Sequence, residues 1–367
     1  MNITFLIGNG FDLNCGLKSS YQDVYNEYCK INETDSELIK NFKKNIKNDY
    51  KTWGDFELAM AEKINDFKSE NDFVKCIIDF KTYLVKYLSE EKRKFFEKYN
   101  TDSIKVDVYN EVLNSIRSFY KNNTNNISNS VYKQIFFSNI NYTFVSFNYT
   151  CIFNEIFNSF SKEYKRKFIN IHGSLEDNDV VLGIDNEQQL KSKNFKISDS
   201  GRISFIKPIF NNRYDIDRVI EANNAILESD IICIYGMSLG DSDLTWKNLI
   251  IKWLDSVLSE NDKHLFVYDY ENCKKNIIFK DQQIIEEEKV KEKFITRKLK
   301  IEGTNNKFKK YFDKIHMQFK NIFNINEIVN RTELMRIKAY NQQIKNLKNS
   351  FNNELYLLKD KIREYNE

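Results

Sequence analysis

Proline, histidine and glycine are scarce in this chain, and its cysteines are not paired in sequence. The 367 residues contain one proline, 10 glycines, three histidines and six cysteines. No cysteines have the Cys-x-x-Cys spacing that zinc ribbons and thioredoxin-type centres need, so we expect reduced thiols and no metal site. The apolar run at residues 3–7 is too short for a signal peptide or a membrane span, and no basic region precedes it. We therefore expect a cytoplasmic protein without a membrane partner.

Charge of one sign is not in excess either. The chain has 56 lysines and arginines against 53 aspartates and glutamates, which leaves a formal net charge of +3, and the charges are scattered. This balance does not indicate a nucleic-acid partner. At this length the chain can form roughly two domains, or one large domain with an inserted layer.

Seven of the ten glycines fall in three clusters, and each cluster follows a short apolar run that is typical of a strand. The clusters are Gly8, Gly10 and Gly16; Gly173 and Gly183; and Gly236 and Gly240. Strands are predicted at residues 3–7, 142–147, 168–171, 231–235 and 265–269. Strands that end in glycine or polar residues and lead into helices are typical of a mostly parallel sheet, whose ligands bind beyond the carboxyl ends of the strands. The sequence therefore predicts an α/β fold.

Helical segments surround the predicted sheet. Apolar residues at helical spacing, such as Phe56, Met60 and Phe67, predict a helical insert over residues 21–138. Residues 149–160 and 243–259 are predicted to be crossover helices on the sheet, and residues 281–367 a helical C-terminal region. The sheet domain then comprises residues 1–20 and 139–280.

The last predicted helix carries an apolar stripe at steps of three and four residues. The stripe consists of Ile337, Tyr340, Ile344, Leu347 and Phe351, and it resumes at Leu355, Leu358, Ile362 and Tyr365. Such spacing is typical of a coiled coil and predicts self-association. Packing of the stripe against its own domain explains the pattern equally well.

The segment from Gly8 to Asp12, Gly-Asn-Gly-Phe-Asp, follows the first predicted strand and opens a helix. Glycines at such a turn let the backbone approach a phosphate, whose charge the amides at the helix start would stabilise. Position 13 is leucine where the dinucleotide fingerprint has glycine, and no Gly-Lys-Ser/Thr follows. A tight strand-to-helix turn without a ligand is the alternative.

Two polar residues end the strands that follow. Asn148 has a side chain that can both donate and accept hydrogen bonds, and a helix N-cap is its alternative role. His172 precedes a glycine turn, where a titrating imidazole would face the crevice, and a structural histidine is the alternative. The other histidines are assigned to structure, because His264 precedes a strand and His316 lies on a predicted helical face.

Residues 236–240 match the Gly-x-Ser-x-Gly of a nucleophile elbow and follow a predicted strand. A serine hydrolase that uses Ser238 is therefore a rival hypothesis. Against it, an elbow begins its helix directly after the serine, whereas Asp241 or Asp243 is the better N-cap here.

Such a hydrolase needs an acid and a base from later in the chain. The candidates are Asp255 or Asp269 for the acid and His264 or His316 for the base. A cysteine nucleophile at Cys151, beside Asn148 and His172, is a further alternative.

Taken in order, these segments resemble the abortive-infection AbiH family, and the likeness covers residues 1 to about 270. The motifs are Ile-Gly-Asn-Gly-Phe-Asp-Leu at 7–13, Trp-Gly-Asp-Phe-Glu at 53–57, Ser-Phe-Asn-Tyr-Thr at 146–150, Ile-His-Gly-Ser-Leu at 171–175, and Gly-x-Ser-Leu-Gly at 236–240 with Asp243. Each motif is short, but the ordered set is specific. AbiH proteins in turn resemble the Rossmann-like, sirtuin-type fold of bacterial NAD-consuming defence enzymes.

The resemblance to sirtuin-type enzymes implies roles for the matching positions. Asn148 and His172 would be the catalytic pair, and Gly236 with Ser238 would hold the nucleoside. The phosphate loop would comprise Gly8, Asn9, Gly10, Phe11 and Asp12. Asn9 and Asp12 depart from the pattern, since sirtuins carry alanine and serine there, and Thr150 stands where they carry aspartate. The missing zinc ribbon argues against protein deacetylation.

On this resemblance we expect an anti-phage effector that hydrolyses NAD, its substrate, to nicotinamide and ADP-ribose. A homo-oligomer and a phage-derived trigger are expected as partners. Cleavage through a ribose cation needs positioning and charge stabilisation more than a strong nucleophile. Asn148 would orient ribose and water, and His172 would act as a base. A nucleotide sensor that acts on a partner without cleaving NAD is the first alternative, and the serine hydrolase is the second.

Overall fold

The computed structural model describes residues 1–30, 32–98, 140–158, 165–256, 263–268, 280–302, 306–318, 334 and 337–351. In this part of the chain six strands form one sheet, in which every pair of neighbours is parallel and the order is β3-β2-β1-β4-β5-β6. The strands are β1 (Asn2–Ile7), β2 (Asn141–Ser146), β3 (Lys165–Asn170), β4 (Ile231–Tyr235), β5 (His264–Tyr268) and β6 (Ile315–Gln318).

Helices fill the intervals between the strands. Before β2 come α1 (Gly10–Asn14), α2 (Tyr21–Tyr28), α3 (Glu37–Asn48), η1 (Thr52–Gly54), α4 (Phe56–Glu62), η2 (Lys63–Asp66) and α5 (Glu70–Lys98). Between β2 and β4 come α8 (Ile152–Asn158), η3 (Glu187–Gln189), α9 (Asp199–Phe205), α10 (Lys207–Tyr214) and α11 (Ile216–Leu227). After β4 come η4 (Asp241–Asp243), α12 (Leu244–Asp255), α14 (Lys280–Lys293), the π-helical η5 (Phe294–Lys298) and α15 (Asn306–Lys314). None of the described helices is long and apolar enough to cross a membrane.

Both faces of the sheet are covered. Ile3, Phe5 and Ile7 of β1 pack on one face against a core that includes Phe95 of α5 and residues of α8. Leu6 points to the other face, where residues of α11, α12, α14 and α15 form the core. A parallel sheet that is buried on both faces needs strands without polar alternation. This requirement explains the nearly continuous apolar runs of β1, β4 and β5.

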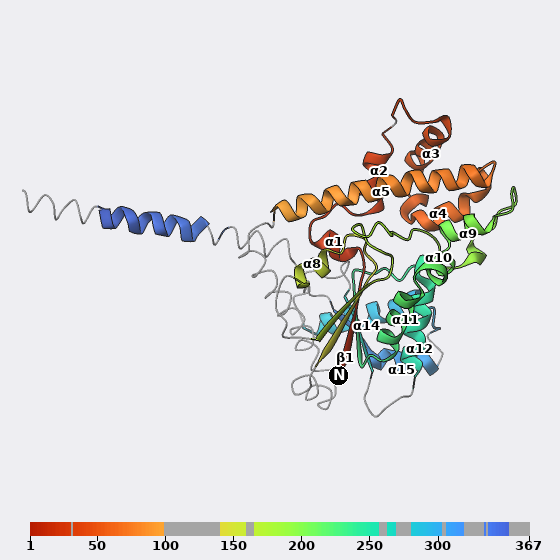
Figure 1. Ribbon diagram of the computed structural model, residues 1–367. Coiled ribbons are helices and arrows are strands. Elements are labelled where there is room, and N and C mark those ends of the chain that lie inside the picture. The colour runs from red at the N-terminus through yellow and green to blue at the C-terminus, as the bar shows by residue number, and fades with distance from the viewer. Residues whose placement is uncertain are drawn as a thin grey trace, which may run out of the picture.

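The helices of residues 21–98 form a second hydrophobic core, to which buried residues between Leu182 and Ile206 also contribute. Trp53, Phe56 and Phe80 are almost fully buried in it, and the stacked rings of Phe56 and Phe80 have centroids 3.8 Å apart. α2 begins with a capping box at Ser20, and Asp55 caps α4. In Figure 1, α2 to α5 lie beyond the end of the sheet at which β1 finishes. The carboxyl ends of the strands therefore face this helical layer.

The predicted α/β fold with a parallel sheet is confirmed. The strands predicted from apolar runs are present as β1 to β5, and α8 and α12 occupy the segments predicted to be crossover helices. The prediction that places His316 on a helical face is wrong, because His316 lies in β6 opposite Phe266 of β5. A four-residue strand that follows α15 directly offers too short a pattern to be separated from helical spacing.

The described part of the C-terminal stripe lies on a helix over residues 337–351, which projects away from the body of the protein in Figure 1. Ile337, Tyr340, Leu347 and Phe351 are 58–70% exposed, so they do not pack against their own domain in this structure. Self-association through the stripe stays a prediction. Its continuation at residues 352–367 lies outside the described residues.

The loops after β1 and β4 touch through the backbones of their glycines. A Cβ on Gly8 would lie 2.5 Å from the carbonyl oxygen of Gly236, and a Cβ on Gly10 would lie 2.5 Å from the Gly236 Cα. Gly236 itself has a φ of 67°, in the left-handed region that favours glycine. The Gly10 amide donates a hydrogen bond of 2.9 Å to the Gly236 carbonyl. These glycines thus permit backbone contact between two loops at the point where the strand order reverses.

We expect Gly10→Ala to lower the melting temperature, because the added methyl group would displace the Gly236 backbone. Overpacking of this kind costs about 1–3 kcal/mol. Gly54→Ala is the matched control, since a Cβ at Gly54 meets no heavy atom within 4 Å. Thermal unfolding followed by circular dichroism measures both variants. A Gly10→Ala variant that melts together with the wild type would show that the two loops are not in tight contact in solution.

Candidate active site

The polar residues singled out in the sequence come together at one edge of the sheet. Ile7, the last residue of β1, lies opposite Ser146 of β2 and Tyr235 of β4. Ser146 in turn lies opposite Asn170 of β3. The residues that follow these strand ends are Gly8, Asn148, His172 and Gly236. They therefore share the carboxyl edge of the sheet, where open parallel sheets bind their ligands.

Asn148 is held by two acceptors from the first loop. Its side-chain Nδ2 donates to the Gly8 carbonyl over 3.1 Å and to Asp12 Oδ1 over 2.9 Å. Both partners accept, so the amide cannot be turned around without facing oxygen toward oxygen. Its Oδ1 is buried and has no hydrogen-bond partner among the described residues. The Asn148 side chain can therefore accept a hydrogen bond from a ligand, but both of its N–H groups are already used. The sequence predicted a side chain that donates and accepts, and the structure leaves only the accepting role open to a ligand.

Asp12 is the anchor of this arrangement. It is 2% exposed, and its second oxygen, Oδ2, accepts from the Thr150 hydroxyl over 2.6 Å. Burial raises the pKa of Asp12 from 3.8 to about 6, although the hydrogen bonds from Thr150 and Asn148 and the charge of Lys92 lower it. Both carboxyl oxygens are used within the protein. Asp12 thus ties the β1 loop to the β2 loop.

His172 lies next to Asn148. Its imidazole hydrogen-bonds the carbonyl of Phe147, which belongs to the same peptide group as the Asn148 amide. Burial and the nearby charge of Lys207 lower the pKa of His172 well below its ordinary value, so the ring is neutral. A neutral imidazole that donates from one nitrogen has an acceptor lone pair on the other. The rings of Phe147 and Tyr149 flank it, with centroids 5.4 and 6.3 Å away.

The amides of the predicted phosphate loop have partners within the protein. The Gly8 amide donates to the Tyr235 carbonyl and the Gly10 amide to the Gly236 carbonyl, each over 2.9 Å. The Phe11 amide donates to the Gly8 carbonyl, and the Phe11 side chain is fully buried in the sheet core. These three amides are therefore not available to a phosphate in this conformation. Binding of phosphate by this loop stays a prediction.

Asn9 and Ser238 are the two predicted binding residues nearest the solvent. The Asn9 side chain donates to the Ser19 carbonyl over 2.9 Å and accepts from the Ser19 hydroxyl over 2.6 Å. Ser238 is exposed and follows Gly236 by two residues. Ser238 can thus meet a ligand at the surface of the site.

The geometry around Ser238 differs from a nucleophile elbow. In an elbow the serine sits on a strained turn that leads directly into a helix. Here Gly236 and Leu239 have positive φ, at 67° and 49°, whereas Ser238 does not, and α12 begins only at Leu244. His264 lies opposite Ile231 at the start of β4, so it occupies the other edge of the sheet from Ser238.

The other candidates for a base or a nucleophile, His264, His316 and Cys151, lie in buried environments that disfavour catalysis. His264 Nδ1 and His316 Nε2 lie 2.9 Å apart in the buried core, and burial with the neighbouring His264 lowers the pKa of His316 to about 3. Burial raises the pKa of the Cys151 thiol to about 12, which disfavours the thiolate that a cysteine nucleophile needs.

A buried charge cluster beside His172 was not predicted from the sequence. Lys207 Nζ lies 3.6 Å from Glu57 Oε1, and the side chains of both are at most 7% exposed. Burial lowers the pKa of Lys207, but the carboxylates of Glu57, Asp243, Asp185 and Asp55 outweigh this effect and raise it. We call these five residues the Lys207 cluster. Among the described residues no three histidine, cysteine, aspartate or glutamate side chains are arranged to hold a metal ion.

In the Lys207 cluster, Asp185 rather than Asp243 accepts a backbone hydrogen bond at the start of α12. Asp243 occupies the N-cap position of α12, as one of the two sequence candidates, but its side chain makes no capping hydrogen bond. The Thr245 amide instead donates to Asp185, from a separate loop. Burial raises the pKa of Asp243, although the charge of Lys207 lowers it. Asp55 and Glu57 belong to the motif at 53–57, which was the available sequence signal for this cluster, although no role was assigned to them.

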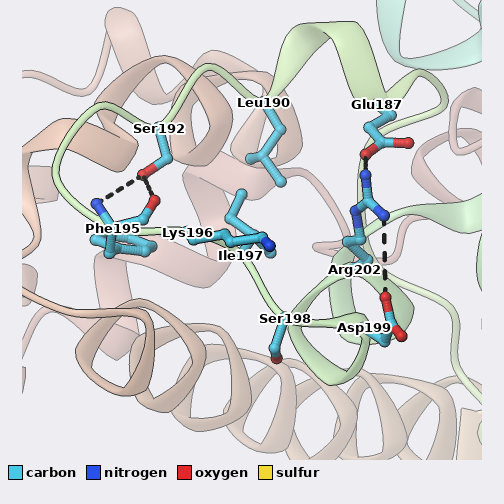
Figure 2. A pocket seen from close by; sticks show the side chains of 9 residues that line it. All are labelled: Glu187, Leu190, Ser192, Phe195, Lys196, Ile197, Ser198, Asp199 and Arg202. Carbon is cyan, nitrogen blue, oxygen red and sulfur yellow. Dashed lines mark hydrogen bonds and ion pairs between the residues drawn. The ribbon is translucent and has the colours of Figure 1, made fainter.

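A hollow of about 540 Å³ lies away from these motifs, along the loop from Glu187 to Arg202. Figure 2 shows Arg202 between Glu187 and Asp199, and a closed turn in which the Ser192 hydroxyl bonds the Phe195 backbone. None of the residues predicted to bind or react lines it. The strand edge is therefore the better candidate site.

Comparison with known proteins agrees with the motifs. The chain matches the family described as bacteriophage abortive infection AbiH over residues 4–258, which is well over half of its length. The chain belongs to this family. The match confirms the AbiH resemblance inferred from the ordered motifs and connects the protein with abortive infection of bacteriophage. No curated protein matches the chain.

We expect Asp12→Asn to keep the site intact and to change how stability depends on pH. An asparagine can still accept from Asn148 and can donate to Thr150. Because the folded pKa of Asp12 is raised, this group's contribution to stability is fully present below pH 3.8 and is lost as pH rises through about 6. The free energy of unfolding of the wild type should therefore fall, relative to the variant, by roughly 2 to 3 kcal/mol between pH 3 and pH 8. Urea unfolding across this range measures the difference, and parallel curves would contradict the buried, protonatable Asp12.

Proposed function

We propose that this AbiH protein is an anti-phage effector that hydrolyses NAD at the bond between nicotinamide and ribose. Membership of the family supports the abortive-infection role. One observation carries the chemistry: the Asn148 side-chain oxygen is buried, fixed in direction by Asp12 and Gly8, and without a protein partner in the described chain. An acceptor fixed in this way is suited to a sugar hydroxyl or a water. A phage-derived trigger and a homo-oligomeric state belong to the same proposal.

His172 complements this acceptor. Its free nitrogen provides a second lone pair, on the next strand end and close to the Asn148 peptide group. In the proposed reaction the bond from ribose to nicotinamide breaks, its electron pair leaves with nicotinamide, and water adds to the ribose carbon. Two fixed acceptors hold ribose hydroxyls and the water in place, which is the positioning that a reaction through a ribose cation requires.

The departures from the sirtuin pattern compensate for each other. Asp12 stands where sirtuins carry serine, and Thr150 stands where they carry aspartate. These two side chains are hydrogen-bonded to each other, with 2.6 Å between Thr150 Oγ1 and Asp12 Oδ2. Relative to sirtuins, the hydroxyl and the carboxylate have thus exchanged positions between residues 12 and 150, which are in contact. The exchange favours the sirtuin-type interpretation, because the pair keeps the same chemical groups.

The arrangement of the strands favours a dinucleotide at the same edge. Doubly wound sheets that bind dinucleotides have the order β3-β2-β1-β4-β5-β6 and bind them where the order reverses. We propose that the nicotinamide ribose lies at Asn148 and His172, and that the adenosine side lies over Gly236 and the exposed Ser238. Because the amides of Gly8 and Gly10 are used internally, the proposal requires other donors for the phosphates.

The test is release of nicotinamide from NAD by the purified protein. We expect the wild type to release it and His172→Ala to lose this activity while it stays folded. Ser238→Ala is the comparison variant, and we expect it to raise KM while kcat stays near the wild-type value. Chromatography of the products and circular dichroism of the variants provide the measurements.

Two outcomes would contradict the proposal in different ways. Covalent labelling of Ser238 by a fluorophosphonate probe, with loss of a hydrolytic activity in Ser238→Ala, would favour the serine hydrolase. Binding of NAD measured by calorimetry, without any release of nicotinamide, would favour a nucleotide sensor.

A further inference from the structure

The Lys207 cluster joins the helical insert to the candidate site. Asp55 and Glu57 come from the insert, at the start of α4, whereas Lys207 begins α10. Tyr149 connects the cluster to His172: its ring is 6.3 Å from the imidazole, and the nearby carboxylates of Glu57, Asp243 and Asp55, after burial, raise the pKa of its hydroxyl. Lys207 is also near enough to lower the pKa of His172. The cluster and the Asn148–His172 pair are therefore neighbours.

Lys207 has unsatisfied hydrogen-bond donors. Its side chain is 5% exposed, and its one ion pair, at 3.6 Å to Glu57, is longer than a hydrogen bond. No acceptor in the described chain lies within hydrogen-bond distance of its ammonium group. Nearby carboxylates stabilise the charge of this ammonium, but its N–H groups can still donate hydrogen bonds to a ligand or to solvent. Asn148 Oδ1, which is buried and has no hydrogen-bond partner in the described chain, belongs to the neighbouring pair.

The charge of the cluster selects the kind of ligand. The charges of four carboxyl groups act on Lys207, and Glu57 lies nearest among the distances given, so an anionic phosphate at this point would be repelled. Sugar hydroxyls and a developing positive charge are favoured. The nicotinamide ring of NAD is cationic, and the ribose becomes cationic as the bond to it breaks.

Glu57 has the environment of an acid–base group. Its Oε2 accepts from the Tyr21 hydroxyl over 2.9 Å, and its Oε1 faces Lys207. Burial raises its pKa to about 7; Lys207 and Tyr21 lower the pKa, whereas Asp55 and Asp243 raise it further. His172, in contrast, is a weak base, because burial and Lys207 disfavour its protonated form.

We propose that Glu57 is a catalytic residue of this site, the general base that takes the proton from the attacking water, and that Lys207 is the positioning residue that orients it. The inference rests on the proposed hydrolysis of NAD. As the bond from ribose to nicotinamide breaks and nicotinamide leaves with the electron pair, the water oxygen bonds to the ribose carbon and one water proton passes to the Glu57 carboxylate. That proton is released to solvent at the end of the cycle, and His172 holds a ribose hydroxyl.

The test compares Glu57→Gln with Glu62→Gln, a matched control on the exposed side of the same helix. General-base catalysis contributes about 10²- to 10⁴-fold, so we expect Glu57→Gln to lower kcat at least 100-fold. KM should change by less than about threefold, because substrate binding is retained. The wild-type kcat should fall as pH drops through about 7, since the base must be ionised, and Glu57→Gln should lack this dependence. Glu62→Gln should match the wild type in both respects.

A second variant covers the case in which Glu57→Gln does not fold around the unpaired Lys207. Glu57→Asp keeps a carboxylate, and we expect it to fold, retain part of the activity and shift the apparent pKa of the kcat profile. An active wild type with an unchanged kcat and pH profile in Glu57→Gln, or with an unchanged profile in Glu57→Asp, would overturn the role of Glu57 and leave the proposed function standing. An inactive wild type would overturn both.

Discussion

The hydrogen bonds between Asp12, Gly8 and Asn148 fix the chemistry of the strand edge. The amide of Asn148 donates twice, to a backbone carbonyl and to a buried carboxylate, and both acceptors come from the loop after β1. A charge-assisted hydrogen bond of this kind contributes about 1.5–3 kcal/mol. Its geometric consequence matters more, because it leaves only the oxygen of Asn148 free. Asp12 is buried, and this burial raises its pKa. Because Asp12 accepts from the Asn148 amide, it sets the direction of Asn148 Oδ1, the acceptor that remains open.

The Lys207 cluster places a different constraint on the fold. Buried ionised groups destabilise a protein unless they are paired, and here the buried ammonium of Lys207 is paired with Glu57 and stabilised by the charges of three further carboxyl groups. The aromatic core of the helical insert offsets that cost nearby, with Phe56 directly between Asp55 and Glu57 in the sequence and fully buried. The same motif thus packs the insert with one residue and directs two carboxylates toward the sheet edge. Apolar residues of similar volume at buried ion-pair positions often give equal or greater stability, so this cluster is weak evidence for a role in stability.

The sequence predicted the sheet well because its signal is local. The strands β1, β2, β4 and β5 are short and largely apolar and end next to a glycine or polar residue, and that pattern needs no knowledge of neighbours. β3 begins with three basic residues, so only its second half gave this signal. Asn148 and His172 were found for the same reason, since both follow such runs. β6 was missed because four residues directly after a helix give too short a pattern.

The remaining features depend on contacts between distant segments. The internal use of the Gly8 and Gly10 amides follows from the contact between the β1 and β4 loops, more than two hundred residues apart in the sequence. Lys207 and Asp185 were missed because nothing in their local sequence distinguishes a buried, paired side chain from a solvated one. Their partners come from the insert and from α12, which only the fold brings together.

The most direct measurement of the central claim is a crystal structure of the His172→Ala variant with NAD bound. We predict a ribose hydroxyl, or a water next to the ribose, within hydrogen-bond distance of Asn148 Oδ1, with the nicotinamide ribose facing Glu57. A nucleotide bound elsewhere, such as in the hollow between Glu187 and Arg202, with no ligand atom at Asn148, would contradict it.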